Sequence, residues 1–152
     1  MSDVRTTLLF TIKLQAAAPQ LLGKTPLGER RVVPVTGGHF EGPRLKGTVE
    51  PGGSDWILVR PDGSLRLDVR LTLKTDDGAL IGMTYAGFRH GPPAVIERLG
   101  RGEAVDPSEY YFRTVPLFET GAPKYAWLNN IVSVALGHRP PDGPVYRVFE
   151  VL

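Results

Sequence analysis

Asp68 and Arg70 are one pair of residues in this sequence that could do chemistry, because they lie two apart in an alternating segment, residues 65–75. Side chains two apart in a strand point to the same face, so a carboxylate and a guanidinium would lie side by side. The other face of this segment is aliphatic and should be buried. In a half-buried sheet the polar pair faces water. In a barrel wide enough for a ligand, the pair can face the lumen, where Arg70 would hold a carboxylate or phenolate and Asp68 would orient it or act as a base.

Arg113 is a second candidate, because it shares a strand face with Tyr111 among bulky and β-branched neighbours. A buried arginine needs a partner for its charge. One interpretation is a structural ion pair with Asp55, Asp68 or Glu119. The other is an anionic ligand held by the guanidinium, and the sequence supports both equally.

Aromatic residues gather in residues 110–136, with single polar residues spaced among them. Tyr125, Trp127 and Asn129 fall on one face of a predicted strand and would suit a flat aromatic ligand, with Asn129 supplying orientation. Tyr85, at the end of another predicted strand, could complete the wall. The alternative is an aromatic barrel or sandwich core in which the polar groups sit at strand ends.

Several classes of site and partner have no support. The sequence has no cysteine, and His39, His90 and His138 are widely spaced, so we expect no metal site. Neither a phosphate loop nor a dinucleotide fingerprint occurs, so we expect no cofactor. The net charge is only +2 and no basic run is present, which argues against nucleic acid. With no apolar run of membrane-spanning length and no signal peptide, we expect a soluble cytoplasmic protein of bacterial type that does not bind membranes.

The pattern of apolar residues and turns predicts an all-β chain. Turns such as Pro61-Asp62-Gly63-Ser64 and Asp76-Asp77-Gly78 separate extended runs, which is typical of β-hairpins. We therefore predict one domain over residues 1–152, an antiparallel β-barrel or sandwich, with the barrel favoured because closure removes edge strands. One short helix is expected at 93–100. The expected strands are 4–14, 31–35, 45–49, 56–60, 65–75, 79–87, two runs within 110–136 including 125–136, and 145–152.

The apolar pattern of three of these strands predicts their facing and the assembly of the chain. In residues 4–14 the alternation predicts one common face for Val4, Thr6, Leu8, Phe10, Ile12 and Leu14. Residues 125–136 and 145–152 offer more apolar faces than one narrow barrel needs. A surplus apolar patch usually marks an interface, so we expect a homo-oligomer, most simply a dimer.

Several ordered motifs resemble those of the DUF3237 family, also called UPF0311. They run through nearly the whole chain: Gly37-Gly38-x-Phe40-x-Gly42-Pro43, Pro51-Gly52-Gly53-x-Asp55-Trp56, Asp68-x-Arg70, Thr75-Asp76-Asp77-Gly78, Tyr111-Phe112-Arg113-Thr114 and Tyr125-x-Trp127-Leu128-Asn129. The resemblance implies a compact antiparallel β-barrel, often oligomeric. It also implies, for some members, cofactor-independent action on small organic acids or phenolic compounds. Because Asp68 and Arg70 are among the motifs, it favours the interpretation in which both face the lumen.

These observations lead to one functional hypothesis and one alternative. The hypothesis is a cofactor-independent lyase or isomerase that acts on a small anionic, aromatic or phenolic compound by decarboxylation, elimination, isomerisation or cyclisation. The alternative is a non-catalytic barrel that binds a small molecule. The expected catalytic residues are Asp55, Asp68, Arg70, Tyr85 and Arg113, with Arg70, Arg113 and at least one of the two aspartates buried around one cavity. The expected substrate-binding residues are Phe40, Trp56, Tyr111, Tyr125, Trp127 and Asn129.

Overall fold

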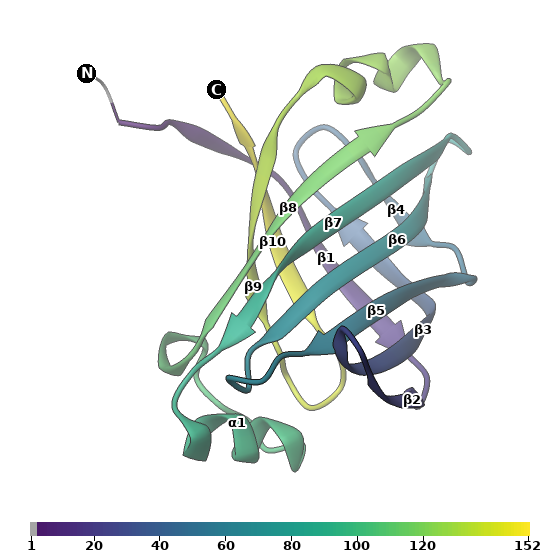
Figure 1. The fold of residues 1–152 in the computed structure, drawn as a ribbon. Coiled ribbons are helices and arrows are strands. Elements are labelled where there is room, and N and C mark those ends of the chain that lie inside the picture. Colours follow the sequence, from purple (N-terminus) through teal and green to yellow (C-terminus); the bar gives the residue numbers. More distant parts are fainter. Residues whose placement is uncertain (1–2) are drawn as a thin grey trace.

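The computed structural model describes residues 3–152, which form ten strands, one α-helix and two short 3-10 helices (Figure 1). The strands are β1 Thr6–Ala16, β2 Gln20–Thr25, β3 Gly28–Glu41, β4 Lys46–Val49, β5 Gly53–Val59, β6 Leu65–Thr75, β7 Leu80–His90, β8 Tyr111–Glu119, β9 Ser133–His138 and β10 Val145–Val151. The helices are α1 Pro93–Gly100, η1 Pro107–Glu109 and η2 Pro123–Asn130. The predicted short helix is therefore confirmed.

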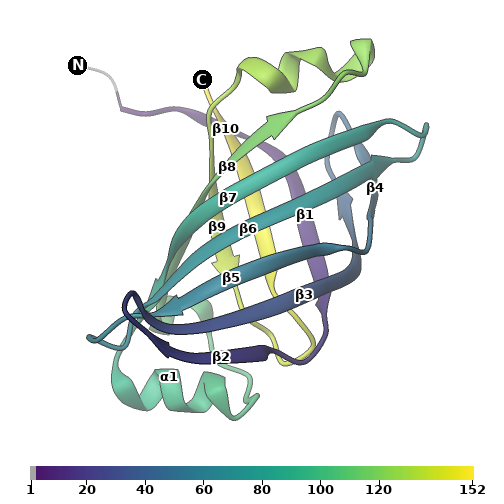
Figure 2. The same ribbon diagram turned by 45° about the vertical axis from the view of Figure 1, so that its right-hand side comes forward.

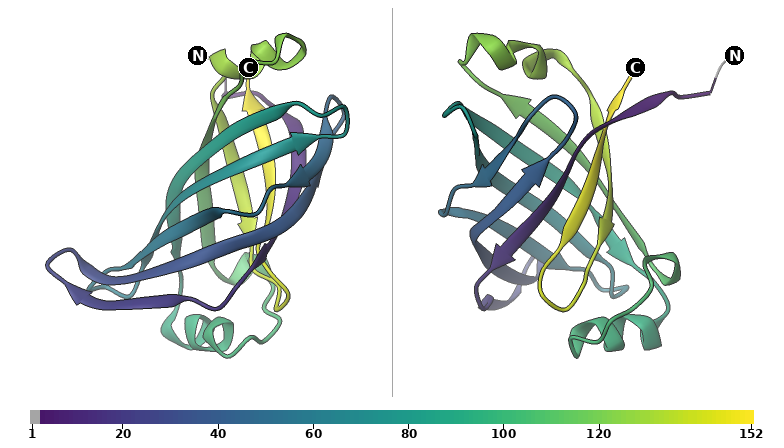
Figure 3. Two further views of the ribbon diagram at one scale, coloured as in Figure 1. Left: turned by 90° about the vertical axis from the view of Figure 1, so that its right-hand side faces the viewer. Right: turned by 180° about the vertical axis from the view of Figure 1, so that it is seen from behind.

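The strands close into an antiparallel barrel, as predicted. Their order is β1-β10-β9-β8-β7-β6-β4-β3, and β3 pairs back onto β1. Strands β4 and β5 both lie between β3 and β6, so they share one position and the barrel has eight strand positions. Strand β2 pairs with the start of β3, and together they form a hairpin that projects from the barrel wall (Figure 3, left).

Strand β6 shows which face of the sheet is inside. Its side chains alternate strictly between buried and exposed, with Leu65, Leu67, Val69, Leu71 and Leu73 buried in the lumen. The polar side chains of β6 consequently face outward. Removing this aliphatic face from water is the main favourable term for closing the barrel.

Strand β1 departs from the predicted alternation. A register shift between Leu8 and Phe10 places Leu9 and Phe10 both in the core, whereas Leu8 is exposed. A β-bulge inserts one extra residue into a strand and reverses the facing of everything before it. The predicted common face is thus correct for Phe10, Ile12 and Leu14 and wrong for the residues before the bulge.

The predicted strand over residues 125–136 is also wrong in its first half, which is the 3-10 helix η2. A 3-10 helix has three residues per turn, so Tyr125 and Leu128 point to the same side, and both are buried. Pro123 opens η2, where its fixed φ is favourable and no N–H is needed. The Asn129 amide then ties the end of η2 to Thr120, accepting from its N–H at 2.7 Å and donating to its carbonyl at 3.0 Å.

The two ends of the barrel are closed differently. Helix η2 lies across one end and α1 beside the other (Figure 1 and Figure 2). The half of the lumen near η2 is filled by rings, with Phe10 5.3 Å from Phe40 and 5.8 Å from Phe118 between centroids. We call this part the packed half. None of the helices within residues 3–152 is both long and apolar enough to cross a membrane.

Candidate active site in the barrel cavity

The half of the lumen next to α1 is hollow. It holds a partly enclosed cavity of about 310 Å³ whose walls include Leu67 and Val69 of β6, Phe112 of β8 and Leu99 at the end of α1. The size is near the lower end for small-molecule sites, and the combination of apolar walls with a few polar groups is typical of them. The polar side chains that line it are Arg31, Asp55, Tyr85, Arg89, Arg139 and Tyr146.

Strand alternation places these polar side chains inside. Asp55 on β5 is paired with Val69 of β6 and Val33 of β3, which also line the cavity. Arg31 lies two residues before Val33 and therefore shares its face. On β7 the inward series that includes Tyr85 continues through Gly87 to Arg89. The cavity thus receives its carboxyl from β5 and one cation from β3 on one side. A second cation comes from β7, which lies beyond β6 on the other side.

Asp55 is the carboxyl group of the cavity. Its Oδ1 accepts a hydrogen bond from the backbone N–H of Asp68 at 3.2 Å, and it forms none of the ion pairs found within residues 3–152. Burial raises the pKa of Asp55 to about 7, and the negative charge of Asp68 adds to the increase. The Asp68 N–H and the positive charge of Arg89 act in the opposite direction. A carboxyl group with this pKa can both give and take a proton near neutral pH.

Two tyrosines stand beside Asp55. Tyr85 and Tyr146 are almost fully buried, and their rings meet edge to face with centroids 5.1 Å apart. Burial raises the pKa of both hydroxyls, and the negative charge of Asp55 raises both further. Interaction with the Tyr146 hydroxyl also raises the pKa of Tyr85. Both phenols therefore stay protonated and serve the cavity as hydrogen-bond donors.

The three arginines have few partners for their charge, although the Arg31 side chain is 39% exposed and Arg139 Nη1 donates to the Pro140 carbonyl. Burial and the nearby charge of Arg139 lower the pKa of Arg89. Neither of these two forms an ion pair within the part of the chain that the structure describes, and Arg31 has only Glu29, at 3.9 Å. The Nε atoms of Arg31 and Arg89 are buried without any hydrogen-bond partner. Both donors are unsatisfied, and an anionic ligand in the cavity would satisfy them if the side chains turned toward it.

Most of the predicted catalytic residues lie elsewhere. Asp68, Arg70 and Arg113 are exposed on the outside of β6 and β8, so the prediction that both arginines are buried around a common cavity is wrong. The reason is that the opposite face of each strand fills the lumen, as the simple half-buried interpretation requires. That inward face is aliphatic on β6 and consists of Phe112, Thr114, Pro116 and Phe118 on β8. Arg113 Nη1 donates to the Phe112 carbonyl at 2.8 Å, and its guanidinium lies 5.2 Å from the Tyr111 ring centroid. Of the predicted catalytic residues, Asp55 and Tyr85 line the cavity.

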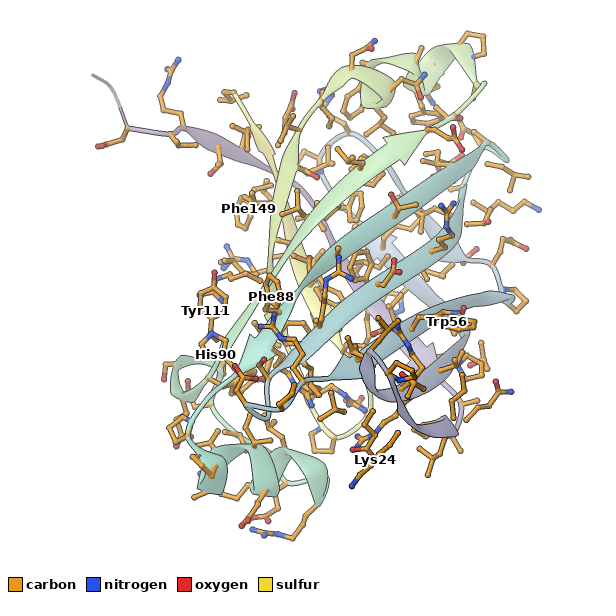
Figure 4. The ribbon with its side chains drawn as sticks, viewed as in Figure 1. Lys24, Trp56, Phe88, His90, Tyr111 and Phe149 are labelled. Atoms are coloured by element: carbon orange, nitrogen blue, oxygen red, sulfur yellow. The ribbon has the colours of Figure 1, made fainter. Side chains whose placement is uncertain are left out.

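The predicted substrate-binding residues do not line the cavity. Trp56 and Tyr111 point outward from the barrel and are each 47% exposed (Figure 4). Phe40 belongs to the packed half.

The remaining three, which include Tyr125, lie on η2 at the opposite end. The Tyr125 hydroxyl donates to Asp77 at 2.9 Å. Trp127 lies under the guanidinium of Arg44, 3.5 Å from its carbon to the ring centroid. Asn129 makes the clamp to Thr120 described above, so all three side chains make structural contacts.

Four of the six polar residues that line the cavity were not predicted. The alternation of β7 extends by two steps beyond Tyr85 to Arg89, and Tyr146 lies two residues before buried Val148 on the same face of β10. Both could therefore have been found by continuing the inward series. Arg31 lies within a β-branched run, which is a weaker signal. Arg139 follows β9 in a loop, where no periodicity applies. Among residues 3–152 there is no cluster of three or more His, Asp or Glu side chains arranged as metal ligands.

Comparison with known proteins gives the family but little about activity. A family model described as a protein of unknown function, DUF3237, matches residues 4–151. A UPF0311 protein of Clostridium acetobutylicum is 38% identical over 144 residues, covering 94% of this chain and 91% of its own. Another, from Rhodopseudomonas palustris, is 38% identical over 149 residues, covering 98% and 97%. The solved structure of a conserved protein of unknown function from that organism matches with a TM-score of 0.93 at 37% identity over 100% of this chain and 99% of its own.

One similar protein is named as an enzyme. The hydroalkoxylation enzyme of Penicillium herquei is 27% identical over 125 residues, which cover 82% of this chain and 68% of that protein. The solved structure of an enzyme from the same fungus matches with a TM-score of 0.75 at 22% identity, over 100% of this chain and 97% of that one, which shows the shared fold alone.

Proposed function

This chain belongs to the DUF3237 family, and from that premise we propose that its barrel cavity is the active site of a cofactor-independent enzyme. The substrate is a small anionic compound with an aromatic or phenolic ring, and the reaction is a proton-transfer reaction of the lyase or isomerase type. The observation that carries the proposal is the position of Asp55. A carboxyl group without an ion-pair partner among residues 3–152 faces a partly enclosed cavity together with three guanidinium groups and two phenols.

The roles follow from the chemistry of each group. Asp55 is the proton donor or acceptor, because its pKa of about 7 keeps both of its protonation states populated near neutral pH. Tyr85 and Tyr146 remain protonated and donate hydrogen bonds to an oxygen that gains charge during the reaction. The arginines stabilise that charge in a cavity with apolar walls, where electrostatic interactions are stronger than in water. The protein thus supplies acid, base and cation from its own side chains.

The named activity of the fungal relative fits this set of groups. A hydroalkoxylation adds an O–H group across a C=C bond: the oxygen loses its proton and bonds to one carbon, and the other carbon gains a proton. When both groups belong to one molecule the product is a ring and no atom is lost. A carboxyl group that exchanges protons near pH 7 can perform either transfer, and arginine stabilises the phenolate or enolate in between.

A second candidate function is small-molecule binding without turnover. The observation that favours it is the pair of unpartnered Arg Nε atoms, which need only a bound anion and no chemistry. Binding and catalysis use the same cavity, so they are separated by experiment at Asp55.

The test uses dialysed, chelator-treated protein and a panel of phenols that carry an alkene side chain or a carboxylate, with consumption followed by NMR. We expect wild-type protein to convert at least one class, and Asp55→Asn to lower the rate by about 10²–10⁴. Asp68→Asn is the comparison variant, because that carboxylate is exposed outside the barrel and its backbone N–H to Asp55 is kept. Loss of the Asp68 charge lowers the pKa of Asp55, and it should reduce the activity far less than Asp55→Asn does.

Three results would count against the proposal. Equal activity of Asp55→Asn and wild type would remove Asp55 from the mechanism. Binding of several phenols without conversion would favour the non-catalytic alternative. A larger loss in Asp68→Asn than in Asp55→Asn would place the chemistry outside the barrel.

A further inference from the structure

The cavity has more positive charge than it can neutralise. Arg31, Arg89 and Arg139 line it, and Asp55 is the one carboxyl group among its lining residues. Glu29 lies 3.9 Å from Arg31, so one positive charge remains in excess when Asp55 is ionised and two remain when Asp55 is protonated. Buried charge is costly unless it is paired, so the cavity is built to receive negative charge from a ligand.

The unpartnered Nε edges of two arginines indicate the shape of that charge. The Nε atoms of Arg31 and Arg89 are both buried and unpartnered. A carboxylate binds an arginine through two parallel N–H···O bonds, and the Nε edge of the guanidinium offers such a pair of donors. The Nε edge of each arginine is covered by protein in this structure, and each can take a carboxylate of its own once its side chain turns toward the cavity.

The two arginines lie on different walls. Arg31 is on β3 and Arg89 is on β7, and the order β3-β5-β6-β7 separates them by three strand spacings, about 14 Å along the wall. In a barrel of eight strand positions this places them nearly opposite one another. Asp55 is on β5, between them. A ligand lying across the cavity from Arg31 to Arg89 would pass in front of Asp55.

Building on the proposed function, we infer that the substrate is a dicarboxylate of about one ring in size, with one carboxylate on Arg31 and the other on Arg89. Arg139, whose charge acts on Arg89, strengthens the second position. The cavity volume of about 310 Å³ accommodates a single ring with two such groups. The reacting atom lies between the carboxylates, within reach of Asp55.

The experiment is calorimetric titration of the intact protein with three probes of similar shape: isophthalate, benzoate and benzamide, which carry two, one and no carboxylates. We expect isophthalate to bind at least tenfold more tightly than benzoate, and benzamide to bind more weakly than both. Higher salt should weaken isophthalate more than benzoate, because more charge is involved. Equal affinity for isophthalate and benzoate would overturn the inference without any variant.

Variants then assign the two positions. Arg31→Met and Arg89→Met should each reduce the isophthalate affinity to that of benzoate, whereas Arg113→Met, on the outside of β8, should change it less than twofold. A preference for isophthalate that survives in both cavity variants would contradict the assignment. Circular dichroism and thermal unfolding establish that each variant is folded.

The outcome is separable from that of the proposed function. Tight isophthalate binding, with no conversion of any dicarboxylated ring compound, would support the ligand class and contradict catalysis. Conversion of monoanionic phenols, with no preference for isophthalate over benzoate, would support catalysis and contradict the ligand class.

Discussion

Replacing Asp55 with asparagine should make the stability of the barrel less dependent on pH. In the folded protein the pKa of Asp55 is about 7, against an ordinary value of 3.8. Below pH 3.8 both folded and unfolded chains hold the proton. Above it the unfolded chain loses the proton while the folded chain keeps it, so the stability contributed by the protonated carboxyl declines until the pH passes 7. Asparagine does not titrate and lacks this decline.

The magnitude follows from the two pKa values. Each pH unit between them costs about 1.4 kcal/mol of unfolding free energy. Between pH 5 and pH 8.5 the expected loss from Asp55 alone is about 2.5 kcal/mol, because the decline flattens above pH 7. For a chain of this length that is a shift of the melting temperature of roughly 5–10 °C.

The assay is urea unfolding of wild type and Asp55→Asn at pH 5 and at pH 8.5. All other titrating groups are shared, so the difference between the two proteins isolates Asp55, and any constant cost of the amide is the same at both pH values. Between the two conditions the free energy of unfolding should fall by about 2.5 kcal/mol more for wild type than for the variant. If the gap between the two proteins is the same at both pH values, Asp55 is ionised in the folded barrel and the reasoning about its environment fails.

Two further predictions concern packing and assembly. Gly137→Ala should lower the free energy of unfolding by about 1–3 kcal/mol, because a Cβ there would lie 2.5 Å from the buried ring of Phe112. Gly121→Ala, with open space around it, is the control. Urea unfolding that finds both variants equally stable would contradict the packing argument. The outer faces of β8 and β9 expose Val115 and Val134 by 52% and 38%, and we expect them to pair two copies of the 16.6 kDa chain into a dimer. Light scattering should give twice the chain mass for wild type and the chain mass for Val134→Glu, whereas a monomeric wild type across the micromolar range would refute the dimer.

The sequence predicted the fold well because the barrel is built from local rules. The alternation over residues 65–75 gave β6 its full length, and Pro93 and Gly100 marked α1. The errors came where a single residue changes the phase of a pattern. The bulge after Leu8 reverses the facing of the first residues of β1, and η2 replaces a period of two by a period of three. Neither leaves a strong signal in one sequence.

The site was harder to predict than the fold. Asp55 and Tyr85 were found, but the polar residues with the most regular spacing, Asp68 and Arg70, are on the outside. Regular alternation of charged and aliphatic residues is typical of a wall with water on one side. A cavity instead breaks the apolar series at isolated positions, such as Arg89 at the end of the inward series of β7. Which of these breaks meet in space depends on closure of the barrel, and that is a property of the whole chain.

The division of the barrel into a packed half and a hollow half has a consequence for how such a protein changes over generations. The rings of Phe10, Phe40 and Phe118 are buried and pack against one another in the part of the lumen away from the cavity. Substitutions around the cavity therefore remove fewer stabilising contacts than substitutions among these rings, and more of them are tolerated. A lineage can exchange one set of polar groups at the open end for another while the closed end preserves folding. The same fold can in this way serve descendants with different small molecules.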